Sequence, residues 1–198
     1  MATLHFHYGT MGCSKSAQLI INAYNQAKNG NPTEIIKPKT DNRFSADHVD
    51  SRIGISAPAT VRETLVDYTP NPKTKIVLID EVQFFTPADI DRLVKIADDK
   101  NHPIIVMCYG LMVDSNEQIF PASRRLIEVG AKLHRMESTC QIQGCMHLAT
   151  HHLRFDANGN VVRAGAQIAV GDSNYKSVCR QHFNMLYHGT NGHGRGSR

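Results

Sequence analysis

The sequence predicts an α/β fold in which helices flank a mostly parallel sheet, with a small C-terminal domain. Three features of the sequence support this prediction. A glycine-containing loop, GTMGCSKS at residues 9–16, lies between a short alternating run and a stretch with helical periodicity. Two later runs, KIVLID at residues 75–80 and PIIVMCY at residues 103–109, are almost continuously apolar, as parallel strands buried on both faces are. Paired Cys and His residues after position 139 indicate a small metal-binding domain at the C-terminal end.

Composition limits the class of protein. The chain has 198 residues, 41% of them hydrophobic, which suits one domain with a small appendage. Its formal net charge is +4, and Arg195 and Arg198 near the C-terminal end contribute two of these charges. The rest of the chain is therefore nearly neutral, which does not favour a nucleic-acid binder. We find no apolar run of about 20 residues and no secretory signal, so we expect no membrane span and a cytoplasmic location. An odd number of cysteines, five, then indicates reduced thiols and metal ligands.

The first strand, loop and helix predict an anion site. Residues 4–8 alternate as a strand does, and residues 17–28 repeat apolar side chains at helical spacing. Backbone N–H groups and the positive end of the helix dipole converge where such a loop enters a helix. Lys15 and Ser16 match the phosphate-binding Lys and the Mg²⁺-binding hydroxyl of the P-loop pattern, while Ser14 replaces its second Gly. A chance loop remains the alternative on this stretch alone.

The next elements extend a βαβ order. The sequence Asn-Gly-Asn-Pro at residues 29–32 stops the helix, and residues 33–37 predict the second strand. Residues 41–58 predict a long loop with a short strand at residues 52–55, and this loop is either functional or a solvated excursion. Residues 61–68 predict a helix that Pro70 and Pro72 end.

The strand at residues 75–80 ends on a carboxylate. Ligands bind at the carboxyl ends of strands in open α/β sheets, so Asp80 and Glu81 form a candidate Walker B pair for Mg²⁺ and a nucleophile. Beyond them we expect a helix at residues 88–100, the strand at 103–109, a loop at 110–121, a helix at 124–131 and a last strand at 132–136. The loop at 110–121 should lie at the same edge of the sheet.

Cys140 and Cys145 are followed about 35 residues later by Cys179 and His182, the paired spacing of a tetrahedral structural Zn²⁺ site. Chance clustering is the alternative. Between the pairs, residues 151–155 and 161–163 predict a hairpin around a turn at 156–159, and residues 165–178 predict a loop tethered at Cys179. The predicted domains are residues 1–138 and 139–187, with a disordered tail at 188–198.

Taken in order, these segments resemble the type II thymidine kinases, most closely the bacterial branch, over residues 1–182. The resemblance is carried by GTMGCSKS, TDNRF, SRIG, IDEVQFF, CYGL, the two metal knuckles and VGDSNYKSVCRQH, of which the last is the most specific. It implies a P-loop NTPase-like parallel sheet and a C-terminal zinc-binding domain whose loop wraps over the base as a lasso. It also implies a homotetramer with feedback by dTTP.

The resemblance further implies an ATP-dependent transfer to the 5′-hydroxyl of thymidine. Lys15 and the loop amides would hold the β- and γ-phosphates, Ser16 and, through water, Asp80 would hold Mg²⁺, and Glu81 would be the general base. Arg43 would neutralise developing phosphate charge. The residues expected at ATP are Gly9, Thr10, Met11, Gly12, Cys13, Ser14, Lys15, Ser16, Asp80, Glu81, Val82 and Gln83. Those expected at the nucleoside are Met11, Phe84, Leu111, Val170, Gly171 and Tyr175, for which ordinary packing is the alternative.

Three departures from the family pattern leave alternatives open. Ser14 replaces a P-loop Gly, Ser115 stands where the family usually has an aromatic residue, and the first knuckle has more intervening residues than is usual. The leading hypothesis is an active thymidine kinase that makes dTMP in nucleotide salvage. The others are a nucleoside kinase of shifted specificity and a nucleotide-binding relative with weakened or lost catalysis. Retention of Lys15, Ser16, Asp80 and Glu81 together favours the first two.

Overall fold

The computed structural model describes residues 3–41, 47–163 and 175–189. Its centre is a six-stranded sheet in the order β5-β2-β6-β7-β1-β8, and every neighbouring pair is parallel. The strands are β1 (Thr3–Gly9), β2 (Thr33–Pro38), β5 (Thr60–Arg62), β6 (Ile76–Ile79), β7 (Ile105–Gly110) and β8 (Lys132–Met136). All four residues of β6 are buried, as a central parallel strand requires. The predicted α/β class is confirmed.

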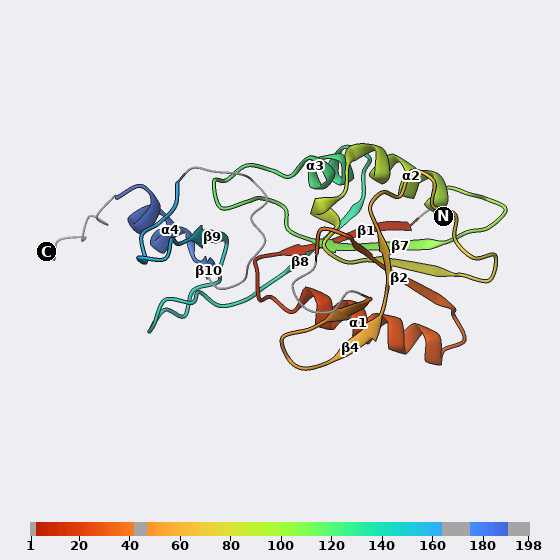
Figure 1. Cartoon of the computed structure of the whole chain (residues 1–198), viewed down its shortest axis with the longest axis horizontal. Coiled ribbons are helices and arrows are strands. Elements are labelled where there is room, and N and C mark those ends of the chain that lie inside the picture. The colour runs from red at the N-terminus through yellow and green to blue at the C-terminus, as the bar shows by residue number, and fades with distance from the viewer. Residues whose placement is uncertain (1–2, 42–46, 164–174, 190–198) are drawn as a thin grey trace, which may run out of the picture.

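Helices cover both faces of this sheet (Figure 1). Helix α1 (Lys15–Lys28) buries Leu19, Ile20 and Ala23 against one face, where Leu78 and Tyr109 belong to the same apolar cluster. Helices α2 (Pro87–Ala97) and α3 (Pro121–Glu128) pack on the other face in a larger cluster. Each fully buried Leu or Ile contributes about 1.5–3 kcal/mol, so this two-sided burial stabilises the fold more than helix propensity does.

Helix α2 begins at a defined cap. The Thr86 hydroxyl accepts from the backbone N–H of Asp89, and the Asp89 carboxylate accepts from the backbone N–H of Thr86. The same carboxylate accepts from the Thr64 hydroxyl at 2.6 Å and from the Leu65 backbone N–H at 2.5 Å. Asp89 therefore joins the start of α2 to the segment that follows β5. Its carboxylate is fully buried, and these donors satisfy it.

Two sequence predictions between residues 41 and 68 are wrong. The helix predicted at residues 61–68 is instead strand β5 followed by turns, because the segment pairs with β2 at the edge of the sheet. An isolated stretch of this length is too short to be a stable helix by itself. The strand predicted at residues 52–55 is the turn between β3 (His48–Asp50) and β4 (Ser56–Pro58), where Gly54 adopts φ +85°. Such an angle favours glycine.

The C-terminal segment has a small core of its own, formed by Cys140, Leu153, Val178, Cys179 and Phe183. Strand β9 (His151–Arg154) pairs antiparallel with β10 (Tyr175–Val178), so the predicted loop at residues 165–178 ends in a strand. Of the predicted hairpin, the structure contains the turn at 156–159 and one bridge between Phe155 and Val161. Helix α4 (Arg180–Tyr187) was not predicted. Figure 1 places β9, β10 and α4 at one end of the molecule.

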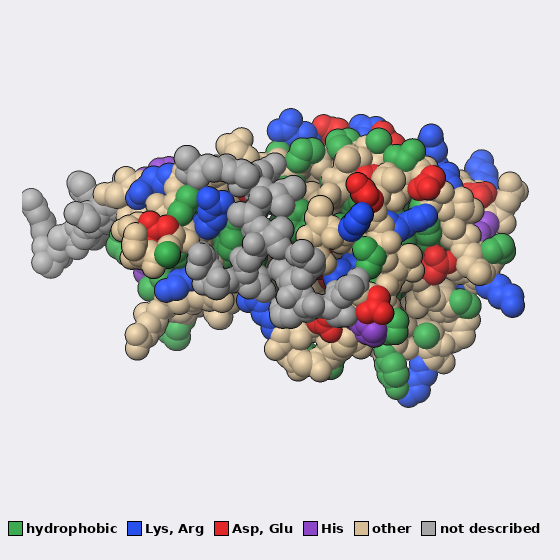
Figure 2. Space-filling view, in the orientation of Figure 1, with side chains coloured by type: hydrophobic (Ala, Val, Ile, Leu, Met, Phe, Trp, Pro, Cys, Tyr) green, Lys and Arg blue, Asp and Glu red, His purple; other side chains and the backbone are tan. Residues whose placement is uncertain are grey.

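The face of the molecule in Figure 2 is mixed in charge. Lys and Arg side chains alternate with Asp and Glu on the sheet half of the face in Figure 2. Among the residues that the structure describes, no helix is long and apolar enough to cross a membrane. The division of the chain at residue 138 stays a prediction, and residues 190–198 of the predicted tail lie outside the described part.

Candidate active site

The carboxyl ends of three strands meet at one edge of the sheet. Strand β1 leads into the loop at residues 9–14, β6 leads into Asp80 and Glu81, and β7 ends at Gly110 and leads into Leu111. In the sheet, β7 lies between β1 and β6. The edge that the sequence predicted from strand order thus holds the three segments that we expected there.

Ser16 and Asp80 are in direct contact, although 64 residues separate them. The Ser16 hydroxyl donates to Asp80 Oδ2 at 3.0 Å, which joins the first turn of α1 to the end of β6. Asp80 is 3% exposed, and burial with the nearby carboxylates of Glu81 and Asp41 raises its pKa, while the Ser16 hydroxyl opposes the shift. A hydroxyl and a carboxylate held together are hard oxygen ligands of the kind that Mg²⁺ takes.

Lys15 lies inside the loop that precedes it. Its ammonium donates to the backbone carbonyls of Thr10 at 2.8 Å and Gly9 at 3.2 Å, and it is 8% exposed. A Cβ at Gly9 would lie 2.3 Å from the Met136 carbonyl oxygen and 2.6 Å from Cys13 Sγ. The first Gly of the loop is therefore required by its contact with the end of β8, and the loop holds a buried cation at its centre.

Ser14 adopts backbone angles that favour glycine. Its φ is 64° and its ψ is 27°, in the left-handed region, and it caps α1 without a side-chain hydrogen bond. Gly12 in the same loop has φ +77°. A Cβ in this region costs about 1–2 kcal/mol. The backbone at Ser14 is therefore strained, and the Ser14 side chain makes no hydrogen bond at the helix cap to offset the cost.

Glu81 is the second strained position at this edge, with φ 46° and ψ 43°. It caps the short 3-10 helix η1 (Val82–Phe84), whose Gln83 side chain connects two strand ends. Gln83 Nε2 donates to Glu81 Oε2 at 2.5 Å, and Gln83 Oε1 accepts from the Leu111 backbone N–H at 2.9 Å. A Cβ at Gly110 would lie 2.4 Å from that amide oxygen, so only glycine leaves room for this bridge. The bridge fixes the direction of the Glu81 carboxylate.

The remaining residues expected at the ligands have different surroundings. Val82 is fully buried in the core and Gln83 is 2% exposed and engaged by Glu81, so a nucleotide could meet their backbone atoms but not their side chains. Phe84 is half-buried and packs edge to face on Phe120. Leu111 and Met11 are also half-buried, and Ser115 is buried. Arg43, Val170 and Gly171 lie outside the described residues.

The structure adds two residues that the sequence did not single out. The Met11 backbone N–H donates to His152 Nε2 at 2.9 Å, and the Ser177 hydroxyl donates to the Met11 carbonyl at 2.7 Å. Burial lowers the pKa of His152 to about 3, assisted by Lys15 and His151, so its ring is neutral and can accept this bond. The strands β9 and β10 therefore hold the glycine loop by both polar groups of one residue. The adjacent histidines at 151 and 152 were the only sequence signal for this contact.

Tyr175 belongs to the same strand as this contact. It pairs with Arg154 of β9 and is two residues before Ser177, so both side chains lie on one face of β10. Since Ser177 reaches Met11 on that face, Tyr175 stands on the side of the glycine loop. Its side chain is half-buried.

The four predicted metal ligands come together. The ligand atoms of Cys140, Cys145, Cys179 and His182 all lie within 4.8 Å of one another. His182 Nδ1 is 3.3 Å from Cys179 Sγ and 3.4 Å from Cys140 Sγ, and the sulfurs of Cys145 and Cys179 are 4.0 Å apart. Tetrahedral Zn²⁺ with ordinary bond lengths separates its ligand atoms by about 3.5–3.8 Å. The cluster therefore fits a metal ion of this size and preference.

The comparisons with known proteins agree with this geometry. The family model described as thymidine kinase matches residues 2–183. A thymidine kinase of Photorhabdus laumondii is 34% identical over 92% of this chain and 92% of its own length. Thymidine kinases of Mannheimia succiniciproducens and Agrobacterium fabrum are each 36% identical over 92% of this chain and cover 95% and 96% of their own lengths. Matches of this extent reach beyond the glycine loop to the metal knuckles, and the chain therefore belongs to the thymidine kinase family.

Proposed function

We propose that this chain transfers the γ-phosphate of ATP to the 5′-hydroxyl of thymidine or deoxyuridine, giving dTMP from thymidine in nucleotide salvage. The observation that carries the proposal is the contact between Ser16 and Asp80 beside Glu81, at the carboxyl edge of the parallel sheet. It brings a candidate metal-binding pair, a cationic loop and the Glu81 carboxylate, the candidate general base, to one place. The names of the relatives give the nucleoside, because each is called thymidine kinase.

Phosphoryl transfer requires positioning and charge neutralisation more than covalent chemistry. In our proposal the backbone N–H groups of residues 9–14 bind the β- and γ-phosphates, and Lys15 exchanges its bonds to loop carbonyls for bonds to phosphate. Ser16 and, through water, Asp80 would hold Mg²⁺, which would supply charge neutralisation for the phosphates when bound. Arg43 adds positive charge from its loop.

Glu81 takes the proton of the 5′-hydroxyl as that oxygen attacks the γ-phosphorus in line. The Gln83 amide donates to Oε2 of the Glu81 carboxylate and so fixes its orientation for proton transfer. Because Gln83 is itself fixed by Leu111, the base is oriented by both neighbouring strand ends. The positive φ of Glu81 is consistent with this role, since strained backbone is kept most often at functional sites.

The nucleoside would lie between η1, the start of the loop after β7 and the C-terminal module. Met11, Phe84 and Leu111 supply apolar walls from three segments, and Tyr175 approaches from β10. Residues 165–178, which include Val170 and Gly171, would cover the base mainly with backbone groups. A base whose polar edge does not match leaves a buried group unpaired, at about 1–3 kcal/mol each.

The proposal includes a structural Zn²⁺ on Cys140, Cys145, Cys179 and His182, a cytoplasmic location, a homotetramer and feedback inhibition by dTTP. The decisive experiment measures transfer of labelled phosphate from ATP to each deoxynucleoside in turn. We expect product with thymidine and deoxyuridine. Product with another nucleoside alone would identify a kinase of shifted specificity, to which Ser115 would contribute. Binding of ATP without any product would identify a relative that has lost catalysis.

Ser14→Gly should increase ATP affinity or turnover by about three- to thirty-fold, the factor that 0.7–2 kcal/mol corresponds to. Glycine adopts the angles measured at Ser14 without the Cβ penalty, so the loop would hold its phosphate-binding shape at lower cost. Calorimetric titration with MgATP, followed by steady-state kinetics, measures both quantities. Ser14→Ala is the matched control, because it removes the hydroxyl and keeps the Cβ. Equal affinity and rate in all three proteins would show that the strain does not affect the ATP site.

His152→Leu should raise the KM for ATP by about five- to 150-fold, because the Met11 N–H then loses its acceptor in a buried place, which costs about 1–3 kcal/mol. Since His152 acts through the loop, kcat should change much less. His152→Gln, which can still accept from the Met11 N–H, should restore most of the affinity. His102→Ala, whose ring contacts the Thr74 carbonyl before β6, is the control. A loss of kcat with an unchanged KM for ATP would contradict this role.

A further inference from the structure

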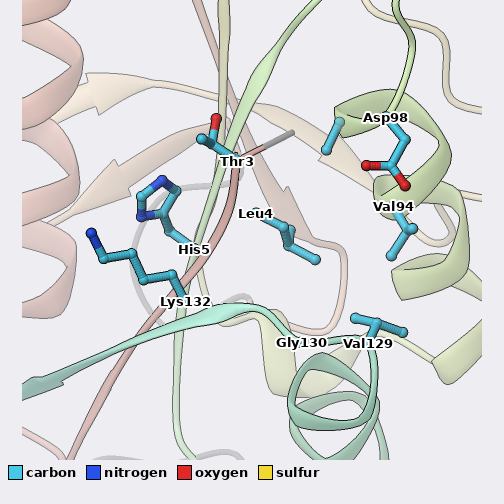
Figure 3. Close-up of a pocket in the computed structure, with 9 residues that line it drawn as sticks. Thr3, Leu4, His5, Val94, Asp98, Val129, Gly130 and Lys132 are labelled. Carbon is cyan, nitrogen blue, oxygen red and sulfur yellow. The ribbon is translucent and has the colours of Figure 1, made fainter. Parts of the chain in front are cut away.

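Three histidines stand together on one face of the central sheet, on the neighbouring strands β1 and β8. His5 and His7 are two residues apart on β1 and therefore share a face. His134 lies on β8, directly opposite His7 in the parallel register. Figure 3 shows His5 beside Lys132 and pointing away from Leu4, Val94 and Val129, so this face is opposite to the one that α2 covers.

The ring nitrogens of this histidine cluster lie near one another. One ring nitrogen of each residue lies within 4.8 Å of the other two. His5 Nδ1 and His134 Nε2 are 2.9 Å apart, and the rings of His7 and His134 are stacked at 4.4 Å. The strand pairing fixes the three Cα positions, so the arrangement does not depend on loops.

The cluster is neutral and incompletely satisfied. Burial lowers the pKa of His7 to about 4, assisted by His134 and His5, and it also lowers the pKa of His5 and His134. Lys132 is the charged neighbour that adds to the lower pKa of both His5 and His134, and the Tyr109 ring stacks on His7. His7 Nε2 is buried and has no hydrogen-bond partner in the described part of the chain. Neutral imidazole with a free ring nitrogen is the form that binds metal ions.

We propose that His5, His7 and His134 form a second cation site, selective for divalent ions that prefer imidazole, such as Ni²⁺, Cu²⁺ or Zn²⁺. Three nitrogen ligands at about 2.1 Å are about 3.4 Å apart around a tetrahedral ion and about 3.0 Å apart at neighbouring positions of a square-planar one, so the rings must close from their present separation. The His7 and His134 rings are stacked nearly parallel, so they must also turn out of the stack to point one nitrogen each at the ion, a rotation that the broad χ2 torsion of His allows. The fourth position of the ion would be left for water.

A cation in the histidine cluster would cross-link β1 to the edge strand β8. Strand β1 leads into the glycine loop and β8 leads toward Cys140, so the ion would join the two strands from which both other sites begin. Binding to the folded state alone raises stability with ligand concentration. A second thermal effect, separate from that of the knuckle zinc, is therefore expected.

The test uses the full chain with its knuckle loaded with Zn²⁺ and titrates Ni²⁺ by calorimetry. We expect one further ion with a dissociation constant in the low micromolar range and a rise in melting temperature. His134→Ala should weaken this binding at least tenfold. His7→Phe, which keeps an aromatic ring on Tyr109, should do the same, and His48→Ala on β3 should leave it unchanged.

Cobalt spectroscopy locates the ion. Co²⁺ in the histidine cluster should show weak visible bands without the near-ultraviolet charge-transfer band that thiolate ligands give. Absence of a further ion in the zinc-loaded protein would overturn the proposal. So would a bound ion that shows the thiolate band, or one that binds equally well to His134→Ala and His7→Phe.

Discussion

Glu81→Gln should reduce the rate of phosphoryl transfer by about 10²–10⁴-fold and leave ATP binding nearly unchanged, the effect expected for loss of a general base. The substitution is close to isosteric, and the new amide oxygen can still accept from Gln83 Nε2. The bridge to Leu111 is therefore retained, and only the ability to take a proton is removed. Single-turnover rates with saturating ATP and thymidine measure the chemical step, and calorimetry measures MgATP affinity.

Glu128→Gln on α3 is the matched control, because it removes a carboxylate that pairs with Arg125 away from the sheet edge. It should retain full activity. A second variant, Glu81→Gly, should be inactive yet more stable to denaturant. The left-handed backbone at this position costs a residue other than glycine about 1–2 kcal/mol, and the glycine removes that cost. Turnover of Glu81→Gln near the wild-type rate would mean that another group accepts the proton.

Cys179→Ser should abolish zinc binding and unfold the C-terminal module. The purified wild-type protein should contain one zinc per chain, and the variant should contain almost none. Structural zinc contributes apparent binding free energies of about 10–16 kcal/mol in small peptides, far more than the five buried residues of the module's core can replace. Metal analysis and hydrogen exchange of the amides of β9, β10 and α4 measure the two effects.

The same variant should also lose ATP affinity, because His152 and Ser177 reach the loop from the strands that the metal cluster supports. Cys108→Ala is the control: Cys108 is a fully buried thiol of the main core, so its removal should lower stability and leave zinc content and ATP affinity intact. Zinc content unchanged in Cys179→Ser would exclude this residue as a ligand. Wild-type protein purified without zinc would exclude the site itself.

Some of the site was readable from the sequence because its signals are local. The glycine loop with Lys15 and Ser16, and the strand that ends on Asp80, each combine a recognisable spacing with a strand that precedes it. A parallel sheet then brings such strand ends to one edge whatever the detailed strand order. The grouping of Cys140, Cys145, Cys179 and His182 was predictable for the same reason, since the signal lies in two short pairs that the fold has only to bring together.

Other features required the tertiary structure because they depend on distant partners. Strand β5 forms by pairing with β2, and β10 forms by pairing with β9, although neither segment reads as a strand by itself. The bonds from His152 and Ser177 to Met11 span more than 140 residues, and no spacing rule reports a contact of that kind.

The sequence by itself determined the fold class, the family and the residues that can carry phosphate, metal and proton chemistry. Only the tertiary structure decided how these residues are held: Glu81 by Gln83 and Gly110, and the glycine loop by β9 and β10. It also assembled the histidine cluster, because β1 and β8 pair in parallel after a separation of more than 120 residues. The physical reason is that the residue type alone fixes the chemistry of a side chain. The orientation of that side chain depends on packing between segments that are distant in the sequence.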